Sequence, residues 1–195
     1  MSGPDAPDAS WLATRPAARF FCEENVWRLC REAPAAWDLH AVIITNAAHT
    51  VAMWEQRATV LDPLVWDYHV VAVTRHPAAV VLDVDARLYT VRPLSEWLGA
   101  SFRAGLRPDM MPRFRVVPAA VYAEVLASDR RHMRDPDGLP TRPFPPWPPP
   151  HPDRPGTLMR LIDVHDDIAG VIVDIAGLAE TFALPHVTLP LMELP

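Results

Sequence analysis

The chain has 195 residues, half of them apolar, and carries a formal net charge of −6 at pH 7. This length predicts one domain that buries a core without disulfides or metal. The acidic balance argues against nucleic acid as a main partner, because phosphate binding requires a basic patch. All 18 basic residues are Arg, which excludes chemistry through a Lys Schiff base.

The two cysteines, Cys22 and Cys30, are expected to be free thiols. On one helix they would lie roughly 12 Å apart along its axis, too far for a disulfide. Without a nearby pair of histidines they also make a poor zinc site, so no metal is expected. Residues 1–18 lack the apolar stretch of a signal peptide, and no apolar run is long enough for a membrane span. We therefore expect a cytoplasmic protein that has no membrane segment.

Hydrophobic periodicity predicts a mixture of helices and strands within a single domain, residues 1–195. After a loose polar leader over residues 1–18, apolar residues at helical spacing predict a helix from Phe20 to Glu32. Apolar runs further along predict strands over 40–46, 50–55, 65–74, 79–88 and 114–117, and helices over 94–99, 118–132 and the end of 168–184. The proline-rich residues 139–156 are expected to form an extended surface strap.

Cys22 is the candidate nucleophile because it lies at the expected start of a helix. There, unpaired backbone N–H groups and the helix dipole favour the thiolate, and the same N–H groups form a natural oxyanion site. A small buried core residue is the alternative interpretation, and by position alone it is the commoner one.

His69 is the candidate base, and the two strands around the turn after residue 74 indicate its partner. If they form an antiparallel hairpin, His69 lies opposite Asp83, with Asp85 on the same face. A carboxylate there fixes the imidazole tautomer and stabilises the imidazolium. A slip of one residue would separate the two side chains, and Asp67 is a weaker alternative partner. The chain order Cys, His, Asp is typical of papain-like or transglutaminase-like thiol hydrolases.

Several motifs together resemble those of protein N-terminal glutamine amidohydrolases. The resemblance extends from about Phe20 to Pro150, and the leader and the residues after Thr157 match poorly. It is carried by Phe21-Cys-Glu-Glu-Asn-Val-Trp27, Trp66-Asp-Tyr-His-Val70, Leu82-Asp-Val-Asp85, Phe114-Arg-Val116, Ser128-Asp-Arg-Arg-His-Met133 and the proline-rich segment that follows.

This resemblance implies a catalytic triad of Cys22, His69 and Asp83. It implies an α+β fold, an α–β–α sandwich with a mainly antiparallel sheet and a papain- or transglutaminase-like core. The implied enzyme is a monomer without a cofactor. It would convert the N-terminal glutamine of proteins or peptides to glutamate through a thioester, releasing ammonia, and the new N-terminal glutamate would mark the product for degradation.

Selection of a chain end requires a partner for the α-ammonium of the substrate, because an unpaired ammonium is costly to desolvate. Glu23 and Glu24 are equally interpretable as first-turn partners of the helix dipole. The candidate substrate-binding residues are Glu23, Glu24, Asp67, Asp85 and Trp66.

Two other functions stay open at this point. The same triad could serve a transglutaminase-like acyl transferase or a peptidase. Alternatively, Phe144–Pro150 could bind a proline-recognising domain in a non-catalytic adaptor. From its residues alone, the segment Ser128–Met133 is expected to be a solvated surface.

Overall fold

The computed structural model describes residues 6–185 and 187–192 of the chain. Six strands form one antiparallel sheet in the order β6-β5-β4-β1-β7-β8. The strands are β1 (His40–Thr45), β4 (His69–Thr74), β5 (Val80–Leu82), β6 (Val91–Pro93), β7 (Arg113–Pro118) and β8 (Val171–Val173). A second, two-stranded sheet pairs β2 (Val51–Met53) with β3 (Leu64–Trp66).

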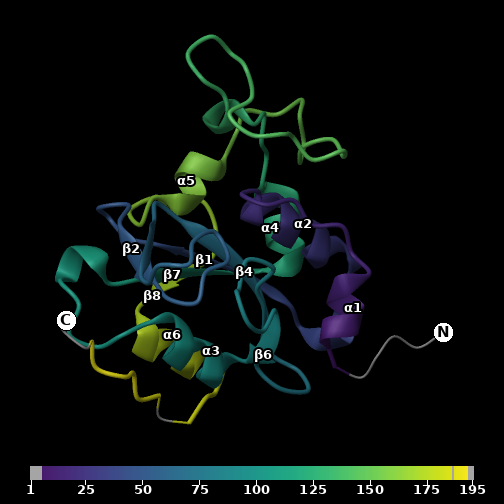
Figure 1. The fold of residues 1–195 in the computed structure, drawn as a ribbon. Coiled ribbons are helices and arrows are strands. Elements are labelled where there is room, and N and C mark those ends of the chain that lie inside the picture. Colours follow the sequence, from purple (N-terminus) through teal and green to yellow (C-terminus); the bar gives the residue numbers. More distant parts are fainter. Residues whose placement is uncertain (1–5, 186, 193–195) are drawn as a thin grey trace.

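Helices cover both faces of the large sheet (Figure 1). The central strands β1 and β4 are buried along their whole length. Because alternate side chains of a strand point to opposite faces, they fill two separate cores. Ile43 and Val70 lie in one core and Ile44 and Val71 in the other. The result is the expected α+β fold, an α–β–α sandwich on a mainly antiparallel sheet.

The helices divide between the two faces according to their core contacts. The first face carries α2 (Cys22–Glu32), α4 (Ala119–Val125) and α5 (Leu158–Ile162). The second face carries α3 (Leu94–Ser101) and α6 (Ile175–Thr181). Three short 3-10 segments join these elements: η1 (Ala35–Trp37), η2 (Pro108–Met110) and η3 (Arg131–Met133).

Several predicted strands are shorter in the structure, and the one expected over 50–55 is reduced to β2. The strand expected over 65–74 is divided between β3 and β4, and at the break the backbone N–H of Tyr68 donates to the carboxylate of Asp67. The strand expected over 79–88 ends at Leu82, and the carboxylate of Asp83 accepts the backbone N–H of Asp85. Such local bonds compete with the sheet ladder, which is why both breaks occur at Asp.

In the leader and over residues 118–132 the structure also differs from the sequence-based expectation. Residues 9–13 of the leader form a short helix, α1 (Ala9–Ala13), whose Trp11 packs edge-on against Trp37 at 4.7 Å between ring centroids. The helix α4 stops at Val125. The strap, residues 139–156, contains neither helix nor strand and runs beyond α2 and α4 at the top of Figure 1.

A buried arginine holds the segment between α5 and β8 in place. Arg115 on β7 is only 2% exposed. Its guanidinium donates to four backbone carbonyl oxygens at 2.6–2.8 Å, those of Leu161, Asp163, Asp166 and Ala169. The Arg115 guanidinium therefore holds this loop by donating hydrogen bonds to carbonyl oxygens, and it forms no ion pair with a carboxylate among the described residues.

Gly170 enters β8 with a φ of 73°, and a Cβ atom there would lie 2.3 Å from the carbonyl oxygen of Val116. We expect Gly170→Ala to lower the free energy of unfolding by about 2–4 kcal/mol, because the backbone conformation and the contact with β7 are both unfavourable for a side chain. Denaturant unfolding followed by circular dichroism measures this. Gly99→Ala, where Cβ meets nothing within 4 Å, is the control. It should stabilise helix α3 by about 0.5–1 kcal/mol. Equal effects of the two substitutions would contradict the argument.

Candidate active site

A pocket of about 460 Å³ lies at the N-terminus of α2. Segments that are far apart in the sequence meet there: the start of α2, the link between β3 and β4, the loop after β5, η3, the strap and α5. The lining residues are Phe20, Cys22, Trp66, Asp67, Tyr68, Asp85, His132, Met133, Thr141, Arg142 and Met159. The pocket therefore contains the predicted nucleophile and most of the predicted substrate-binding residues.

Cys22 is the first residue of α2, and the start of this helix is open to a ligand. The N-cap residue is Phe21, which has no side-chain hydrogen bond to the helix. The first-turn N–H groups of a helix have no acceptor within the helix itself. These donors next to Cys22 are thus placed to bind the oxygen of a carbonyl group that the sulfur attacks.

The surroundings of Cys22 favour the neutral thiol. Burial raises the pKa of Cys22 well above its ordinary value, and the negative charges of Glu23 and Asp85 raise it further. The backbone N–H of Val70 acts in the opposite direction. The helix start taken by itself favours the thiolate. In the folded chain, burial and two carboxylates act against it, so ionisation of Cys22 needs a group that takes the proton.

His69 and Asp83 form a buried pair, and the residue after His69, Val70, bonds to Cys22 through its backbone N–H. The Nε2 atom of His69 lies 3.0 Å from Oδ1 of Asp83. The other oxygen of Asp83 accepts a hydrogen bond from Nε1 of Trp97 at 3.1 Å. The Nδ1 atom of His69 is buried and has no hydrogen-bond partner among the described residues. Since Nε2 is bonded to Asp83, Nδ1 is the ring nitrogen left to exchange a proton.

The two members of the pair shift each other in opposite directions. Burial lowers the pKa of His69, but the charge and hydrogen bond of Asp83, together with the charges of Asp85 and Glu23, outweigh it, and the net pKa is raised. Burial raises the pKa of Asp83, but His69 and the hydrogen bonds from Trp97 and the backbone of Asp85 outweigh it, and the net pKa is lowered. Asp83 therefore favours the imidazolium that proton transfer from a thiol would create.

The expected contact between His69 and Asp83 forms in spite of a different strand register. A hairpin with His69 opposite Asp83 would place Ala72 opposite Val80, whereas Ala72 pairs with Leu82 in the structure. This is a displacement of two residues. Because the side-chain period of a strand is two, Asp83 stays on the face of His69 and reaches it diagonally.

Trp66 and Asp67 both line the pocket but differ in their contacts. The indole of Trp66 stacks on the His69 ring, with centroids 5.4 Å apart and an angle of 14° between the planes. Its Nε1 atom donates to Gln56. Asp67 is exposed, and its carboxylate accepts the backbone N–H of Tyr68. Trp66 therefore fixes the imidazole plane, while Asp67 lies at the solvent side.

The two consecutive glutamates of α2 face different surroundings. Both oxygens of Glu24 are bonded to Arg130 at 2.7 Å, and one also accepts Nε1 of Trp147 at 3.0 Å. Glu24 does not line the pocket and ties α2 to the strap. Glu23 is fully buried behind the pocket lining, with Oε2 at 3.3 Å from the Tyr68 hydroxyl and 3.7 Å from the Cys22 sulfur.

Of the predicted substrate-binding residues, Asp85 is the one whose buried carboxylate is available to a ligand. It lines the pocket and is 7% exposed. Burial raises its pKa, with the nearby charge of His69 acting in the opposite direction. Among the described residues no side chain forms an ion pair with it. A cationic group of a ligand would therefore be its natural partner.

Sequence reasoning missed three residues of the site. Tyr68 bonds to Glu23, Trp97 bonds to Asp83, and His132 lines the pocket. Tyr68 and His132 lie within the motifs that carried the resemblance, which was the available signal. Trp97 lies on α3, and no local pattern in the sequence links it to Asp83. The segment Ser128–Met133, expected to be a solvated surface, contains the buried Ser128 and Arg130.

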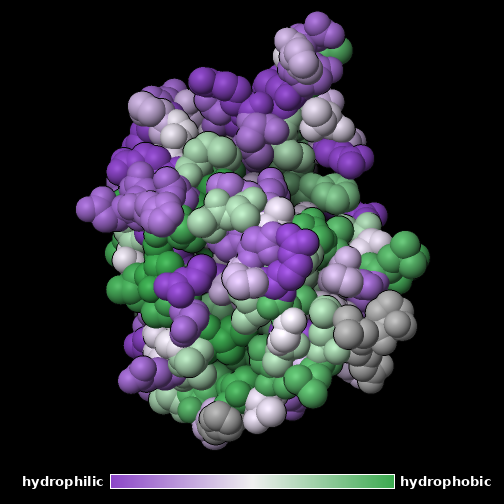
Figure 2. Space-filling view, turned by 90° about the vertical axis from the view of Figure 1, so that its left-hand side faces the viewer, coloured by the Kyte–Doolittle hydropathy of each residue, from purple (hydrophilic) through white to green (hydrophobic). Residues whose placement is uncertain are grey.

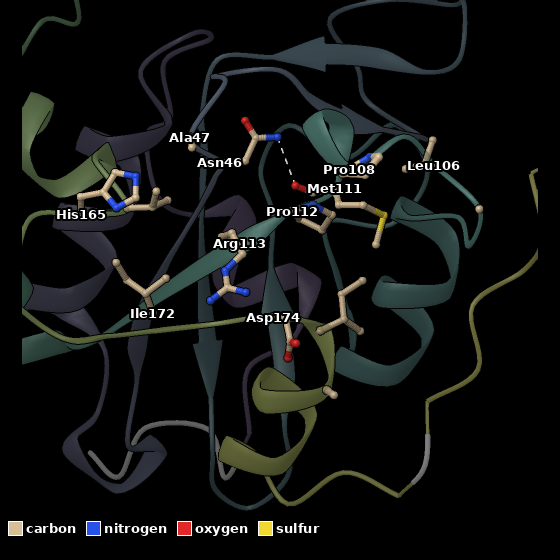
Figure 3. Close-up of a pocket in the computed structure, with 14 residues that line it drawn as sticks. Asn46, Ala47, Leu106, Pro108, Met111, Pro112, Arg113, His165, Ile172 and Asp174 are labelled. Atoms are coloured by element: carbon tan, nitrogen blue, oxygen red, sulfur yellow. Dashed lines mark hydrogen bonds between the residues drawn. The ribbon is translucent and has the colours of Figure 1, made fainter.

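A larger cavity, of about 820 Å³, shares no lining residue with the pocket at Cys22. Figure 3 shows it between Asn46, Arg113, His165 and Asp174. The Asn46 amide, drawn with a dashed line, donates to a backbone carbonyl oxygen. Its lining includes no cysteine, serine or tyrosine. The larger volume therefore does not make it the better candidate for the chemistry.

An apolar groove of about 750 Å³ lies next to this cavity, between α6 and the residues that follow it. Figure 2 shows the corresponding face, with hydrophilic side chains in its upper part and more apolar ones below. Among the described residues that line the groove, Glu180 alone is ionisable. This groove also lacks the groups needed for covalent chemistry.

Over residues 6–185 and 187–192 no group of three or more His, Cys, Asp or Glu residues is placed to hold a metal ion. No helix in the same ranges is long and apolar enough to cross a membrane. Both Cys22 and Cys30 are free thiols, as expected.

An α+β fold with a thiol at a helix start, backed by a paired imidazole and carboxylate, is typical of cysteine-dependent hydrolases. Comparison with known proteins narrows this class. Residues 17–182 match the family described as N-terminal glutamine amidase, and the chain belongs to this family.

Two relatives show how far the similarity extends. The chain is 37% identical over 141 residues to the protein N-terminal glutamine amidohydrolase of Drosophila melanogaster, covering 66% of this chain and 68% of that protein. It is 34% identical over 155 residues to the protein of the same name from Caenorhabditis briggsae, covering 74% and 82%. These matches confirm the family resemblance stated from the motifs.

We expect Asp83→Asn to lower the pKa of His69, because the charge that favours the imidazolium is removed. In the wild type the raised pKa of His69 stabilises the fold at low pH, and this contribution is lost as pH rises through that pKa. The lowered pKa of Asp83 stabilises the fold above its ordinary range, and this contribution is lost as pH falls through that pKa. The pair therefore stabilises the protein between the two values.

Titration of the imidazole signals by NMR measures the change. Asp67→Asn is the matched control, since Asp67 is exposed and is not among the groups that shift His69. An unchanged His69 titration in Asp83→Asn, or an equal change in both variants, would contradict the assigned contact.

Proposed function

We propose that this protein deamidates N-terminal glutamine residues of proteins or peptides, with Cys22, His69 and Asp83 as its catalytic triad. The observation that carries the proposal is a buried thiol at an uncapped helix start, opening into a pocket beside the His69–Asp83 pair. The family to which the chain belongs has relatives named for this activity.

In the proposed reaction, the Cys22 thiol gives its proton to Nδ1 of His69. The thiolate attacks the carbon of the glutamine side-chain carboxamide, forming a C–S bond and placing negative charge on the oxygen. The first-turn N–H groups of α2 bind this oxygen. Asp83 stabilises the imidazolium while it forms.

The tetrahedral intermediate then loses ammonia. His69 transfers its proton to the leaving nitrogen, the C–N bond breaks, and a thioester with Cys22 remains. A water molecule gives a proton to His69 and attacks the thioester carbon. The C–S bond breaks, the sulfur regains the proton, and a peptide with an N-terminal glutamate leaves the pocket.

Asp85 is the residue that we assign to the α-ammonium of the substrate. It is the pocket-lining carboxylate that is both buried and free of an ion pair in the described chain. An ammonium at Asp85 would also offset one of the two negative charges that oppose ionisation of Cys22. Binding of a chain end would thus favour the thiolate, which an internal glutamine, lacking this charge, could not do.

The remaining predicted residues take different roles in this proposal. Trp66 and Tyr68 form walls beside the aliphatic part of the glutamine, and Asp67 stays at the solvent side. Glu24 positions α2 through Arg130 without touching the substrate. Asparagine, which is shorter by one methylene, would hold its carbonyl carbon out of line with the sulfur.

The first test of the function is ammonia release from three peptides, which carry an N-terminal Gln, an internal Gln or an N-terminal Asn. We expect release from the N-terminal Gln peptide alone, and loss of release to the background level in Cys22→Ala, because no other thiol lines the pocket. Cys30→Ala is the matched control and should keep the activity, since Cys30 lies two helical turns along α2.

Other results would favour a different reaction. Joining of the Gln peptide to an added amine in place of hydrolysis would indicate a transglutaminase-like transferase. Cleavage of the peptide chain would indicate a peptidase. No reaction with a folded wild-type protein would overturn the amidase proposal.

A second test addresses the α-ammonium. Asp85→Asn should raise KM for the N-terminal Gln peptide by about 10- to 100-fold, which corresponds to loss of one hydrogen bond to a charged group. Asp67→Asn should change KM little, because Asp67 is exposed. A peptide with an acetylated N-terminus lacks the ammonium. We expect it to react slowly, and at the same rate, with the wild type and with Asp85→Asn. An equal rise of KM for the acetylated peptide would contradict the role of Asp85.

The adaptor alternative loses its main support in the structure of the strap. Phe144 packs edge-on against Phe21 at 6.0 Å between centroids, and Trp147 bonds to Glu24. The aromatic side chains of the proline-rich segment are thus engaged within the chain. We propose further that the chain acts as one catalytic domain and a monomer in the cytoplasm, where Cys22 and Cys30 stay reduced.

A further inference from the structure

Glu23 is a buried carboxylate that the mechanism above does not use. Its exposed fraction is 0%, and its Oε2 atom lies 3.7 Å from the sulfur of Cys22. The hydroxyl of Tyr68 donates to the same oxygen at 3.3 Å. The backbone of Glu23 is held in addition, since the Tyr122 hydroxyl donates to its carbonyl oxygen at 3.3 Å. The carboxylate is therefore fixed next to the nucleophile.

The second oxygen of Glu23 has a different environment. Its Oε1 atom is buried and has no hydrogen-bond partner among the described residues. The nearest cationic candidate is His132, whose Nε2 atom lies 3.5 Å from it. The side chain of His132 comes from η3, is 20% exposed and lines the pocket. His132 is thus close to Glu23 and partly exposed in the pocket.

One oxygen of Glu23 is buried without a hydrogen-bond partner among the described residues, which is unfavourable for a carboxylate, and an ion pair with His132 would supply the missing partner. Without this ion pair, the negative charge of Glu23 faces the Cys22 sulfur with no cation to compensate it. A negative neighbour opposes formation of a thiolate.

We propose that His132, through an ion pair with Glu23, is a positioning residue that makes Cys22 easier to ionise. It acts on the sulfur through Glu23 and does not take the thiol proton, which goes to His69. The negative charge of Glu23 is, after burial, the largest influence that raises the pKa of Cys22. Compensation of that charge is therefore the most direct way to ease ionisation.

Other ionisable groups surround this pair, including His69 on β4, whose pKa the charge of Glu23 raises, and Arg142 of the strap, which lines the same pocket. Tyr68 precedes β4, Tyr122 lies on α4, and Asp85 follows β5; the two tyrosines are neutral donors, and Asp85 adds a negative charge. Two arginines flank His132 in the chain, and each has its own carboxylate. Arg130 is bonded to Glu24 and Arg131 to Asp129. Neither arginine is free to replace His132.

The test is the rate at which iodoacetamide alkylates Cys22, measured from about pH 5 to about pH 9 in a Cys30→Ala background. The variants are His132→Gln, Glu23→Gln and the double variant. His165→Gln is the matched control, because His165 is exposed and lines the other cavity. Mass spectrometry assigns the modified residue, and circular dichroism checks the fold of each variant.

We expect His132→Gln to slow alkylation at neutral pH by about tenfold, because the charge of Glu23 is no longer offset. Glu23→Gln should not slow it, and adding His132→Gln to Glu23→Gln should have no further effect. Slowing by His132→Gln of equal size in both backgrounds would overturn the proposal. So would an unchanged alkylation rate together with a raised KM for the Gln peptide, since His132 would then act on the substrate directly.

The role of the pair in turnover rests on the proposed amidase function, but the alkylation test needs no substrate. Failure of ammonia release in the wild type would overturn the amidase proposal and leave the coupling between His132, Glu23 and Cys22 measurable. Conversely, a normal alkylation rate in His132→Gln would remove the coupling and leave the amidase proposal intact.

Discussion

The ion pair between Glu24 and Arg130 is the contact on which the shape of the pocket depends. Glu24 has no exposed side-chain area and Arg130 only 7%, and two hydrogen bonds of 2.7 Å join them. Arg130 also donates to the carbonyl oxygen of Trp147 in the strap. No strand pairing joins the helix that carries Cys22 to the segment that carries His132 or to the strap. The pair Glu24–Arg130 connects these three parts. Removal of one partner of such a buried pair typically costs about 3–5 kcal/mol.

The two neighbouring glutamates show how position on a helix decides a role. Successive residues of an α-helix point about 100° apart, so Glu23 and Glu24 cannot face the same neighbours. Glu24 turns to Arg130 and the strap, where its charge is compensated. Glu23 turns to Tyr68 and the Cys22 sulfur, where its compensation is incomplete. One glutamate therefore joins α2 to the strap through Arg130, and the other lies against the proposed nucleophile.

The negative charges in the pocket oppose the thiolate form of Cys22 unless other groups offset them. Burial and the charges of Glu23 and Asp85 raise the pKa of Cys22, while Asp83 favours the imidazolium form of His69. A proton acceptor is therefore ready, but the negative product of the transfer is opposed by two carboxylates. A substrate ammonium at Asp85 and a protonated His132 at Glu23 would each remove one of these obstacles. Recognition of the chain end and ionisation of the sulfur would then both depend on compensation of negative charge in the pocket.

Sequence alone determined the parts of this protein that depend on local pattern and spacing. The helix at Cys22, the buried strand β1 and the shared face of His69 and Asp83 follow from side-chain periodicity, which survives the two-residue change of register. The motifs also identified the family. The breaks at Asp67 and Asp83 were missed, because side-chain bonds to nearby N–H groups ended the strands early.

Only the tertiary structure decided which charged groups are compensated. Trp97 reaches Asp83 from a helix on the other face of the sheet, and Arg130 reaches Glu24 across 106 positions of the chain. The expectation that the helix start favours a thiolate at Cys22 is outweighed for the same reason. Desolvation and the field of distant charges act through space, and a sequence pattern records only neighbours along the chain.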